Sequence, residues 1–597
     1  MGEGDASRSA GASVCWLTIA RRYLQCARRL DIRRPMTLIL RQRSKLNARG
    51  RSQTSRETSP FRPRHVNTVP PCTLACPIRN DIRAAMRVIA NRINAGGTHQ
   101  DMVRQAWHTF VETSPFPAVC GRVCPRLCEV ECSRAELEGA VSIGSLERAI
   151  GDRAIELGFE LPMPPVSQTH SKPVAVIGAG PAGLSCAYQL VRLGCAVTVF
   201  ERSGNAGGML RYGIPRFRLP RTVLDAEIAR IIALGVRIEY NTTVGRDLPF
   251  DALLQDYAAV FVAIGAQEGR SLGIPGENGA GVWSATALLR AMELDEKVDI
   301  GDKAVIVGGG NAAIDAARIC RRVGSDVTIV YHRSLAEMPA IRSEFERAKE
   351  EGVVFEFLVK PIEIARENQR MAVLCQRTEL GECDVSGRRR PIPIEAEYLQ
   401  LDCSTLVVAI GQRVDSAGFS GCLRGQNGFL AKGGCWSPMV GVYAGGDAVV
   451  PGLVAAAIAQ GSQAARSIHE DLLRPASTMS HAAHPLEPAF SKQKLNHGWY
   501  GRTERTRHLE AVEVRARLEH PDLEVECGCT WDNAAFESKR CMSCGLCFDC
   551  GHCWSLCSDG AIVRAPIAGD PCSFNLAFCQ GCGKCWEHCP CGCVEKG

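Results

Sequence analysis

Two stretches of the chain share one pattern of apolar and polar positions. In the first, a β-branched apolar run at 174–177 leads through a Gly-rich turn into a helical pattern from about Leu184. A second apolar run, 196–200, then ends on Glu201. Short apolar runs are typical of buried parallel strands, and this order predicts a dinucleotide-binding unit, with a pyrophosphate at the helix N-terminus and the acid on a ribose hydroxyl. The turn consists of Gly178, Ala179, Gly180, Pro181, Ala182 and Gly183.

The second stretch repeats the pattern at 304–333 with one chemical difference. Its strand ends on Tyr331, His332 and Arg333 instead of an acid. An arginine cannot accept a ribose hydrogen bond but can pair with a 2′-phosphate, which favours NADP(H) over NAD(H). If His332 and Arg333 only face solvent, both cofactors remain usable. The turn consists of Gly308, Gly309, Gly310, Asn311, Ala312 and Ala313.

The first unit resumes after the second one ends. Apolar runs close on Gly265 and Gly411, and a later strand at 442–444 leads into Gly446 and Asp447. The pattern therefore predicts an α/β fold with two Rossmann-like domains, the second inserted into the first. Further cofactor-binding candidates in the first domain are Arg202, Gly208 and Leu210.

The chain divides by composition into six segments. A basic tail and a helical cysteine-bearing domain come first, and a polar connector with weak helix signals precedes a cysteine-rich C-terminal domain. In chain order the predicted boundaries are 1–64 for the basic tail, 65–165 for the helical domain, 172–285 with 412–475 for the first nucleotide domain, 286–411 for the second, 476–540 for the connector and 541–597 for the C-terminal domain.

Cysteines supply the strongest motif of the C-terminal domain. The spacing C-x2-C-x2-C-x3-C occurs twice, as in bacterial two-cluster ferredoxins, where the fourth cysteine of each copy binds the other cluster. The spacing predicts a 2[4Fe-4S] ferredoxin-like domain, although Cys541 and Cys544 precede the first copy and blur its register. One cluster is assigned to Cys547, Cys550, Cys553 and Cys589, and the other to Cys557, Cys579, Cys582 and Cys585.

A second group of cysteines lies in the helical domain. Cys124, Cys128 and Cys132 are four residues apart, so on a helix beginning near Pro125 they would share one face. With Cys72 and Cys76 they could bind one or two inorganic centres. The alternatives are zinc, which uses the same thiolates, and cysteines that only pack as small hydrophobic residues.

Charge and hydropathy argue against nucleic-acid binding and against a membrane span. The net charge of the 597 residues is +6, but residues 1–60 hold thirteen Lys and Arg against four Asp and Glu. That segment is either a mitochondrial transit peptide, a disordered tail, or the product of a start assigned upstream of Met36. The remaining chain is slightly acidic, so it offers no case for nucleic-acid binding, and no apolar run reaches the roughly 20 residues of a membrane span. The tight cysteine spacing indicates a reducing cytoplasm.

Several motifs together resemble a known family. The segments CGRVCP, IGSLERAIGDRA, VIGAGPAG, VGGGNAAIDAAR and YAGGDA are similar to those of the small subunit of NADPH-dependent glutamate synthase and of the front of dihydropyrimidine dehydrogenase. The resemblance implies FAD in the first nucleotide domain, with Asp447 near its ribityl or phosphates, and NAD(P)H in the second. It also implies one cluster near the flavin. The matching ligands are Cys76, Cys124, Cys128 and Glu147.

The same resemblance implies a second N-terminal cluster that needs cysteines just before Cys72. Residues 60–71 contain none, so Cys72 and Cys132 lack two partners, and the helical domain holds one cluster or two. The C-terminal domain, with its Cys-Pro-Cys-Gly end, resembles the NAD(P)H:acceptor iron–sulfur flavoprotein of the Dsr sulfur-oxidation system.

The resemblance implies an NAD(P)H:acceptor oxidoreductase in which the flavin links two-electron and one-electron transfer. No acid–base catalytic residue is predicted, because the cofactors carry out the redox chemistry. The expected partner is a sulfite-reductase-like protein or a ferredoxin. The alternative is a glutamate synthase small subunit that serves a large amidotransferase subunit.

Overall fold

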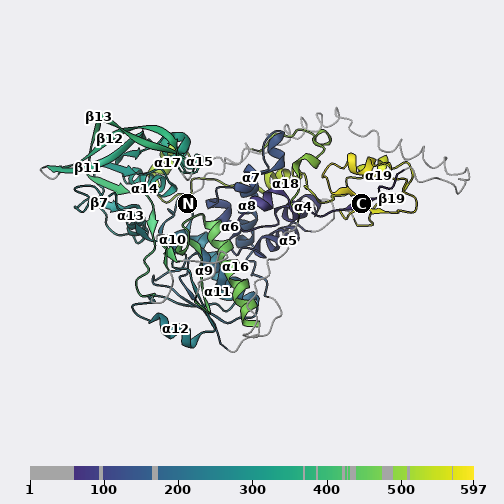
Figure 1. Ribbon diagram of the computed structural model, residues 1–597, viewed down its shortest axis with the longest axis horizontal. Coiled ribbons are helices and arrows are strands. Elements are labelled where there is room, and N and C mark those ends of the chain that lie inside the picture. The colour runs from purple at the N-terminus through teal and green to yellow at the C-terminus, as the bar shows by residue number, and fades with distance from the viewer. Residues whose placement is uncertain are drawn as a thin grey trace, which may run out of the picture. The chain divides into compact units, whose positions relative to one another are not determined.

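The computed structural model describes residues 59–597 except 93–97, 164–171, 368–369, 385–386, 420–423, 426–427, 430–438, 474–487, 507–510 and 568 (Figure 1). The prediction for the basic tail falls almost entirely outside the described residues. Residues 61–579 and 583–597 form the compact unit described below.

A five-stranded parallel sheet forms the first nucleotide domain. The strand order is β18-β5-β2-β3-β4, with Val174 of β2 opposite both Val197 of β3 and Ala259 of β5. All four residues of β2 are buried, as its continuous apolar run predicts. The strands are β2 (Val174–Ile177), β3 (Val197–Phe200), β4 (Arg237–Glu239), β5 (Ala259–Val262) and β18 (Val442–Ala444).

Helices α9 (Pro181–Arg192) and α16 (Val454–Leu473) pack closely together beside this sheet. Gly461 of α16 makes the approach possible, since a Cβ there would lie 2.1 Å from the carbonyl oxygen of Ala182. The other helices of the domain are α10 (Met209–Tyr212), α11 (Arg221–Ala233), α12 (Phe250–Asp256) and the 3-10 turn η4 (Gly446–Ala448).

The second nucleotide domain is a separate parallel sheet of order β10-β9-β8-β14-β7. Strand β7 pairs with β14, so this domain already includes residue 282, and the predicted boundary at 285 is wrong by one strand. The strands are β7 (Val282–Ser284), β8 (Lys303–Val307), β9 (Asp326–Tyr331), β10 (Val354–Phe357) and β14 (Thr405–Val408), and the helices are α13 (Ala285–Glu293), α14 (Asn311–Arg322), η3 (Leu335–Glu337) and α15 (Arg342–Glu350).

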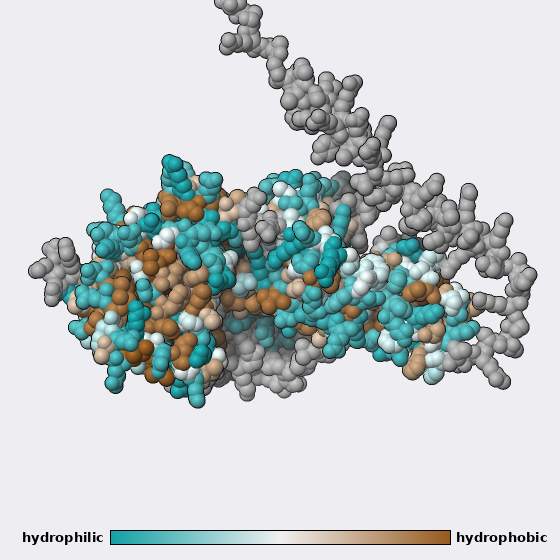
Figure 2. Space-filling model, turned by 90° about the horizontal axis from the view of Figure 1, so that it is seen from above, coloured by the Kyte–Doolittle hydropathy of each residue, from teal (hydrophilic) through white to brown (hydrophobic). Residues whose placement is uncertain are grey.

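An antiparallel sheet that the sequence analysis did not predict lies within this domain. Its strands are β11 (Val359–Glu367), β12 (Arg370–Cys383) and β13 (Arg389–Cys403). On the face seen in Figure 2, hydrophobic residues gather at the left, over this domain. Val354, Ile392 and Tyr398 are among its exposed apolar side chains. None of the helices in the described part of the chain has the length and hydropathy needed to cross a bilayer.

The N-terminal helical domain shares one hydrophobic core with the first nucleotide domain. Trp107 and Leu146 from the first and Leu184 and Ile458 from the second belong to the same buried cluster. The elements are α3 (Pro71–Ala75), α4 (Ile82–Arg92), α5 (His99–Val111), α6 (Pro117–Val123), α7 (Leu127–Val130), η2 (Ser133–Glu136) and α8 (Ile143–Glu156).

The predicted polar connector is in fact packed against the helical domain. Helix α18 (Trp531–Lys539) contacts α4 and α8, and Ala534 is fully buried in their core. Few apolar residues carry this packing. Ion pairs also join the connector to the helical domain, such as those of Arg540 with Glu138 and of Arg122 with Glu524, and the hydropathy of the segment does not reveal them. Helix α17 (Val514–Glu519) and the 3-10 turns η5 (Lys492–Lys494) and η6 (His497–Trp499) complete this segment.

The C-terminal domain is joined to the start of the described chain by one strand pair. Strand β1 (Pro63–His65) is antiparallel to β21 (Val594–Lys596). The domain otherwise has only short elements, α19 (His552–Leu556), β19 (Ile562–Val563), β20 (Ser573–Phe574) and α20 (Lys584–Glu587). The remaining short strands of the chain are β6 (Glu268–Gly269), β15 (Gln412–Arg413), β16 (Arg424–Gly425) and β17 (Gly428–Phe429).

Candidate cofactor and metal sites

The first Gly-rich turn joins β2 to α9 in a geometry that excludes side chains. A Cβ on Gly183 would lie 1.9 Å from the carbonyl oxygen of Gly178, so only glycine lets the helix start so close to the strand. Gly178 itself has φ +102°, and Gly180 is the N-cap that precedes Pro181. The amides at the start of α9 therefore face the end of the sheet, where a pyrophosphate would be bound.

Glu201 lies at the end of β3 and is buried. Its carboxylate accepts hydrogen bonds from the backbone amides of Ala179 and Ser203, both at 2.8 Å. It also lines a cavity together with Gly178, Arg202 and Gly265. The structure thus brings four predicted cofactor-binding residues together, and Glu201 holds the turn in place as well as facing the cavity.

Asp447 lies in the 3-10 turn that follows β18. Its carboxylate accepts a hydrogen bond from the amide of Gly452 at 3.0 Å, and burial raises its pKa to about 6. A Cβ on neighbouring Gly446 would lie 2.9 Å from the Cβ of Ala182, so this turn approaches the start of α9. Gly208 also approaches the turn at Gly180, and Leu210 is buried behind it. The acid and the Gly-rich turn therefore lie on the same side of the first domain.

The second Gly-rich turn joins β8 to α14. Gly308 has φ +142°, and a Cβ on Gly309 would lie 2.6 Å from the ring of Tyr331. The side chain of Asn311 accepts a hydrogen bond from the amide of Ile341 at 2.9 Å. Gly310, Ala312 and Ala313 complete the turn and the first residues of α14.

The structure does not leave Arg333 free. Its guanidinium donates to the carboxylate of Asp384 at 2.8 Å and to the carbonyl oxygen of Arg389 at 2.8 Å, so it fastens β9 to the loop between β12 and β13. Beside it, burial and the charges of Arg333, Lys360 and Arg388 lower the pKa of His332 to about 4. Lys360 and Arg388 were not among the predicted residues, although the basic run at 388–390 was a visible signal.

In the helical domain, three cysteine side chains lie around Glu147 of α8. Cys76 ends α3, Cys124 ends α6 and Cys128 lies in α7. The carboxyl of Glu147 raises the pKa of each of these thiols, in addition to the larger effect of burial, which raises the pKa of Cys124 to about 11. The amide of Asn80 donates to Glu147 at 3.2 Å. Burial and then the nearby Glu227 raise the pKa of Glu147 to about 8. The four predicted ligands therefore lie together, in a donor set that suits iron.

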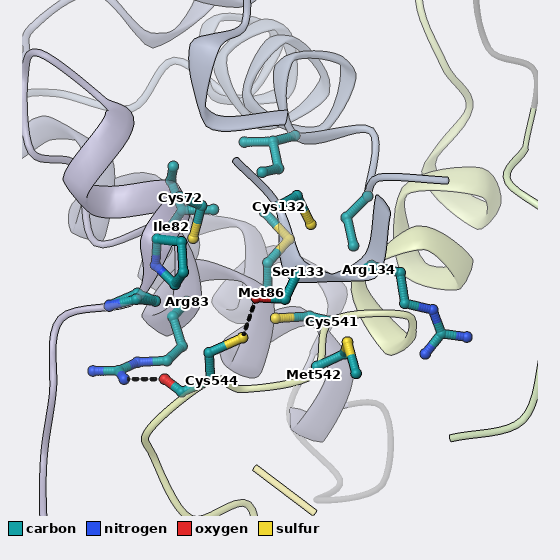
Figure 3. Close-up of a pocket in the computed structure, with 14 residues that line it drawn as sticks. Cys72, Ile82, Arg83, Met86, Cys132, Ser133, Arg134, Cys541, Met542 and Cys544 are labelled. Carbon is teal, nitrogen blue, oxygen red and sulfur yellow. Dashed lines mark hydrogen bonds between the residues drawn. The ribbon is translucent and has the colours of Figure 1, made fainter. Parts of the chain in front are cut away.

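The predicted helix starting near Pro125 is wrong. Arg126 adopts a left-handed conformation with φ +61°, and α7 begins only at Leu127 and ends at Val130. Cys132 therefore leaves the face that Cys128 occupies. It lines a second cavity together with Cys72, Cys541 and Cys544 (Figure 3).

A third cavity lies in the C-terminal domain. It is lined by the first predicted tail set, Cys547, Cys550, Cys553 and Cys589. It also contains His65 from β1 and three cysteines that the spacing did not assign, Cys572, Cys591 and Cys593. The sulfur atoms of Cys589 and Cys593 are 3.7 Å apart, and those of Cys553 and Cys572 are 3.4 Å apart.

The second tail set stays a sequence prediction. Cys582 is exposed, whereas Cys557, Cys579 and Cys585 are half-buried.

Comparisons with known proteins match the same domains. Residues 172–461 match the pyridine nucleotide-disulphide oxidoreductase family, and residues 63–159 match the family described as dihydropyrimidine dehydrogenase domain II, 4Fe-4S cluster.

Three curated relatives span most of the chain. The chain is 37% identical to the NADP(+)-dependent formate dehydrogenase subunit beta of Moorella thermoacetica, over 79% of this chain and 70% of the relative. It is 34% identical to the NADPH-Fe(3+) oxidoreductase subunit beta of Geobacter sulfurreducens, over 79% and 75%. It is 36% identical to the small chain of NADPH glutamate synthase of Escherichia coli, over 67% and 88%.

Proposed function

Because the chain belongs to the family of glutamate synthase small-chain-like iron–sulfur flavoproteins, we propose that it carries electrons between NADP(H) and a redox protein partner. The family makes it an FAD-dependent NAD(P)H oxidoreductase with a 4Fe-4S centre in its helical domain. Our proposal adds the preferred nucleotide, the residues that bind each cofactor and the kind of partner.

One observation carries the proposal. The cysteines around Glu147 and the first nucleotide domain share one hydrophobic core, since Cys128 packs in the same buried cluster as Val176 and Leu184. Glu227 of α11 ties the two together, because its carboxyl accepts from the amides of Ala118 and Val119 at the start of α6, the helix that ends in Cys124. A rigid, dry connection of this kind suits electron transfer between a flavin and a cluster.

Two separate sets of residues would bind the two nucleotides. The turn at 178–183 and Glu201 would hold FAD, and the turn at 308–313 would hold NADP(H). Asp447 would accept a hydrogen bond from the flavin's ribityl chain. When bound, FAD exchanges two electrons with NAD(P)H and single electrons with iron–sulfur clusters. Cys76, Cys124, Cys128 and Glu147 would bind the nearest cluster and exclude water from it.

The preference for NADP(H) rests on a group of cations around His332. Arg333, Lys360 and Arg388 all act on this imidazole. Cations so placed at the end of β9 suit a 2′-phosphate. Since Arg333 already pairs with Asp384, we assign the phosphate contacts mainly to Lys360 and Arg388, with Arg333 holding the loop that presents Arg388.

The partner is proposed to be an iron–sulfur or sulfite-reductase-like protein. Two of the relatives are named as beta subunits, of a formate dehydrogenase and of an NADPH-Fe(3+) oxidoreductase. The cysteine-rich C-terminal domain favours delivery of single electrons to such a partner. A second candidate, the small chain of glutamate synthase, is supported by the match over 88% of that relative.

The test is NAD(P)H-dependent reduction of a viologen dye by the anaerobically purified chain. We expect bound FAD, iron and a higher kcat/KM for NADPH than for NADH. Gly183→Val should abolish FAD binding and activity, because its side chain would collide with the carbonyl of Gly178. Gly501→Ala is the matched control, since a Cβ there meets nothing within 4 Å. A chain that binds no FAD, or that Gly183→Val leaves fully active, would contradict the proposal.

A further inference from the structure

We propose that Cys541 and Cys544 complete an iron–sulfur site with Cys72 and Cys132, so that both ends of the chain bind one [4Fe-4S] cluster. The proposal rests on the iron–sulfur chemistry proposed above but not on the identity of the electron acceptor. It assigns ligands that cysteine spacing alone leaves without a centre.

The four cysteines line one cavity although they come from three separate places in the sequence. Cys72 lies in α3, Cys132 precedes η2, and Cys541 and Cys544 follow α18. Figure 3 shows the four sulfur atoms turned toward a common space.

The rest of the cavity wall suits a cluster. It is mostly apolar, with Ile82, Met86, Val141, Ile143 and Met542 among its residues. An apolar shell around thiolates is what iron–sulfur centres use to exclude water and set their potential. Four half-buried thiols would be an unusual choice for filling an apolar core, where larger side chains bury more surface.

Polar contacts hold the C-terminal pair in position. Arg83 of α4 is buried and donates to the carbonyl oxygen of Cys544 at 2.6 Å, and its other bonds go to Thr68 and Asn67. The sulfur of Cys544 lies 3.4 Å from the hydroxyl of Ser133, which can donate to it when Cys544 is a thiolate. The N-terminal segment is therefore shaped to receive residues 541–544.

The four sulfur atoms are not gathered as tightly as the four ligands of a zinc ion. At a Zn–S distance of about 2.3 Å, a tetrahedral site sets its sulfurs about 3.8 Å apart. Among the residues that the structure describes, the group of His, Cys, Asp and Glu side chains with all ligand atoms within 4.8 Å of one another is Cys589, Cys591 and Cys593. The four cysteines of this cavity do not form a group of that kind.

This ligand set also explains the missing cysteines of the N-terminal segment. Residues 60–71 contain no cysteine, whereas Cys541-x2-Cys544 stands just outside the two ferredoxin-type motifs of the tail. The tail motifs can therefore keep their own eight cysteines, and the extra pair becomes the second half of an N-terminal centre.

The test compares metal content among cysteine variants of the full chain, purified anaerobically. The double variant Cys541→Ser/Cys544→Ser and the single variant Cys72→Ser should each lose about four irons and four sulfides per FAD, and the same EPR signal of the reduced protein. Cys529→Ser is the matched control, because this half-buried thiol of the same segment donates to the carbonyl of Ser145, a bond that serine can keep. It should retain all the iron of the wild type.

Three results would overturn the proposal. They are unchanged iron in the double variant, loss of zinc in place of iron, and loss of different EPR signals in the double variant and in Cys72→Ser. FAD content and NAD(P)H-dependent dye reduction are measured in the same samples. If they fail while the iron pattern holds, the proposed function is wrong and this site stands.

A second measurement covers the case in which the double variant does not fold. In the wild-type protein, alkylation by iodoacetamide should spare all four cysteines and reach them together once an iron chelator has removed the cluster. Alkylation of Cys541 and Cys544 while Cys72 and Cys132 stay protected would contradict the proposal.

Discussion

The two cavities lined by cysteines of the tail segment are built in opposite ways. The tail cavity, lined by Cys547, Cys550, Cys553 and Cys589, takes all its predicted ligands from one short domain. The composite cavity is lined by cysteines from distant parts of the chain, Cys72, Cys132, Cys541 and Cys544. A local site needs only its own loops, whereas a composite site exists only after the connector has docked.

This difference gives the composite site a structural role. Its ligands would hold residues 541–544 against the helical domain, just ahead of the first tail motif. Buried arginines reinforce the same junction, since Arg540 donates to Glu537 and to the carbonyl oxygens of Gly139 and Ala140. We therefore expect damage at the junction to remove the composite cluster, while changes inside the tail spare it.

The largest effect should come from Gly545, which separates the two cavities. It has φ +73°, its amide donates to the carbonyl of Cys591 at 2.7 Å, and a Cβ would lie 2.0 Å from the hydroxyl of Thr68. Gly545→Val should destabilise the folded chain by about 3–5 kcal/mol, from the left-handed backbone together with overpacking. Iron analysis and urea unfolding should show loss of both clusters. Retention of either one would mean that the two cavities do not share this hinge.

A comparably large loss of stability is expected from a change at Glu537, and it should affect only the composite cavity. Its buried carboxylate accepts from the amides of Ser142 and Thr506 and from Arg540. Burial alone raises the pKa of Glu537, but these hydrogen bonds and the charge of Arg540 bring it below its usual value. Glu537→Gln should cost about 2–3 kcal/mol at pH 7, because buried donors lose a charged acceptor.

The pH dependence provides the control for this prediction. A group whose pKa is lower in the folded state stabilises the fold above its unfolded pKa of about 4.5, and this stability is lost as the pH falls. The difference in unfolding free energy between the wild type and Glu537→Gln should therefore stay constant from pH 7 to about 5 and shrink as the pH falls below about 4.5. A difference that persists unchanged, or grows, below that pH would contradict the role given to the carboxylate.

How far the sequence could predict these features depends on the distance between the interacting residues. The two Gly-rich turns, the strands beside them and the α/β class follow from local spacing, and the fold class is confirmed. The position of Cys541 and Cys544 in the same cavity as Cys72 could not be predicted, because nothing in the spacing of either segment refers to the other. The pairing of Arg333 with Asp384 was missed for the same reason.

Local sequence patterns also gave a wrong prediction where the backbone conformation of a single residue interrupts a helix. The spacing of Cys124, Cys128 and Cys132 fits a helix, but the left-handed conformation of Arg126 interrupts it and sends Cys132 to another cavity. The three antiparallel strands escaped prediction because β13 is mostly exposed and shows no regular alternation of buried and exposed positions.

A moderate effect is expected at Arg83, which touches the composite cavity alone. Arg83→Met keeps the length of the side chain but removes its bonds to Cys544, Thr68 and Asn67. Loss of donors to buried carbonyls should cost about 2 kcal/mol. The variant should lose the composite cluster at a lower chelator concentration than the wild type does, with the tail signal unchanged. Equal sensitivity of both signals would show that the cavities form one unit.

The smallest loss of stability is expected from a change at His65, the residue of strand β1 that lines the tail cavity. Its ring stacks on Phe574 at 4.7 Å and contacts the carbonyl oxygen of Cys572 at 2.5 Å, while its strand pairs with β21. His65→Ala should destabilise the tail by about 1 kcal/mol, the usual contribution of one ring contact. EPR during stepwise chelation should show earlier loss of a tail signal and an unaltered composite signal. Arg64→Ala on the same strand is the control, because its ion pair with Glu595 at 3.9 Å is largely exposed and should contribute nothing measurable. If His65→Ala removed the composite cluster first, the N-terminal strand would support both cavities, and the division between a local site and a composite site would be wrong.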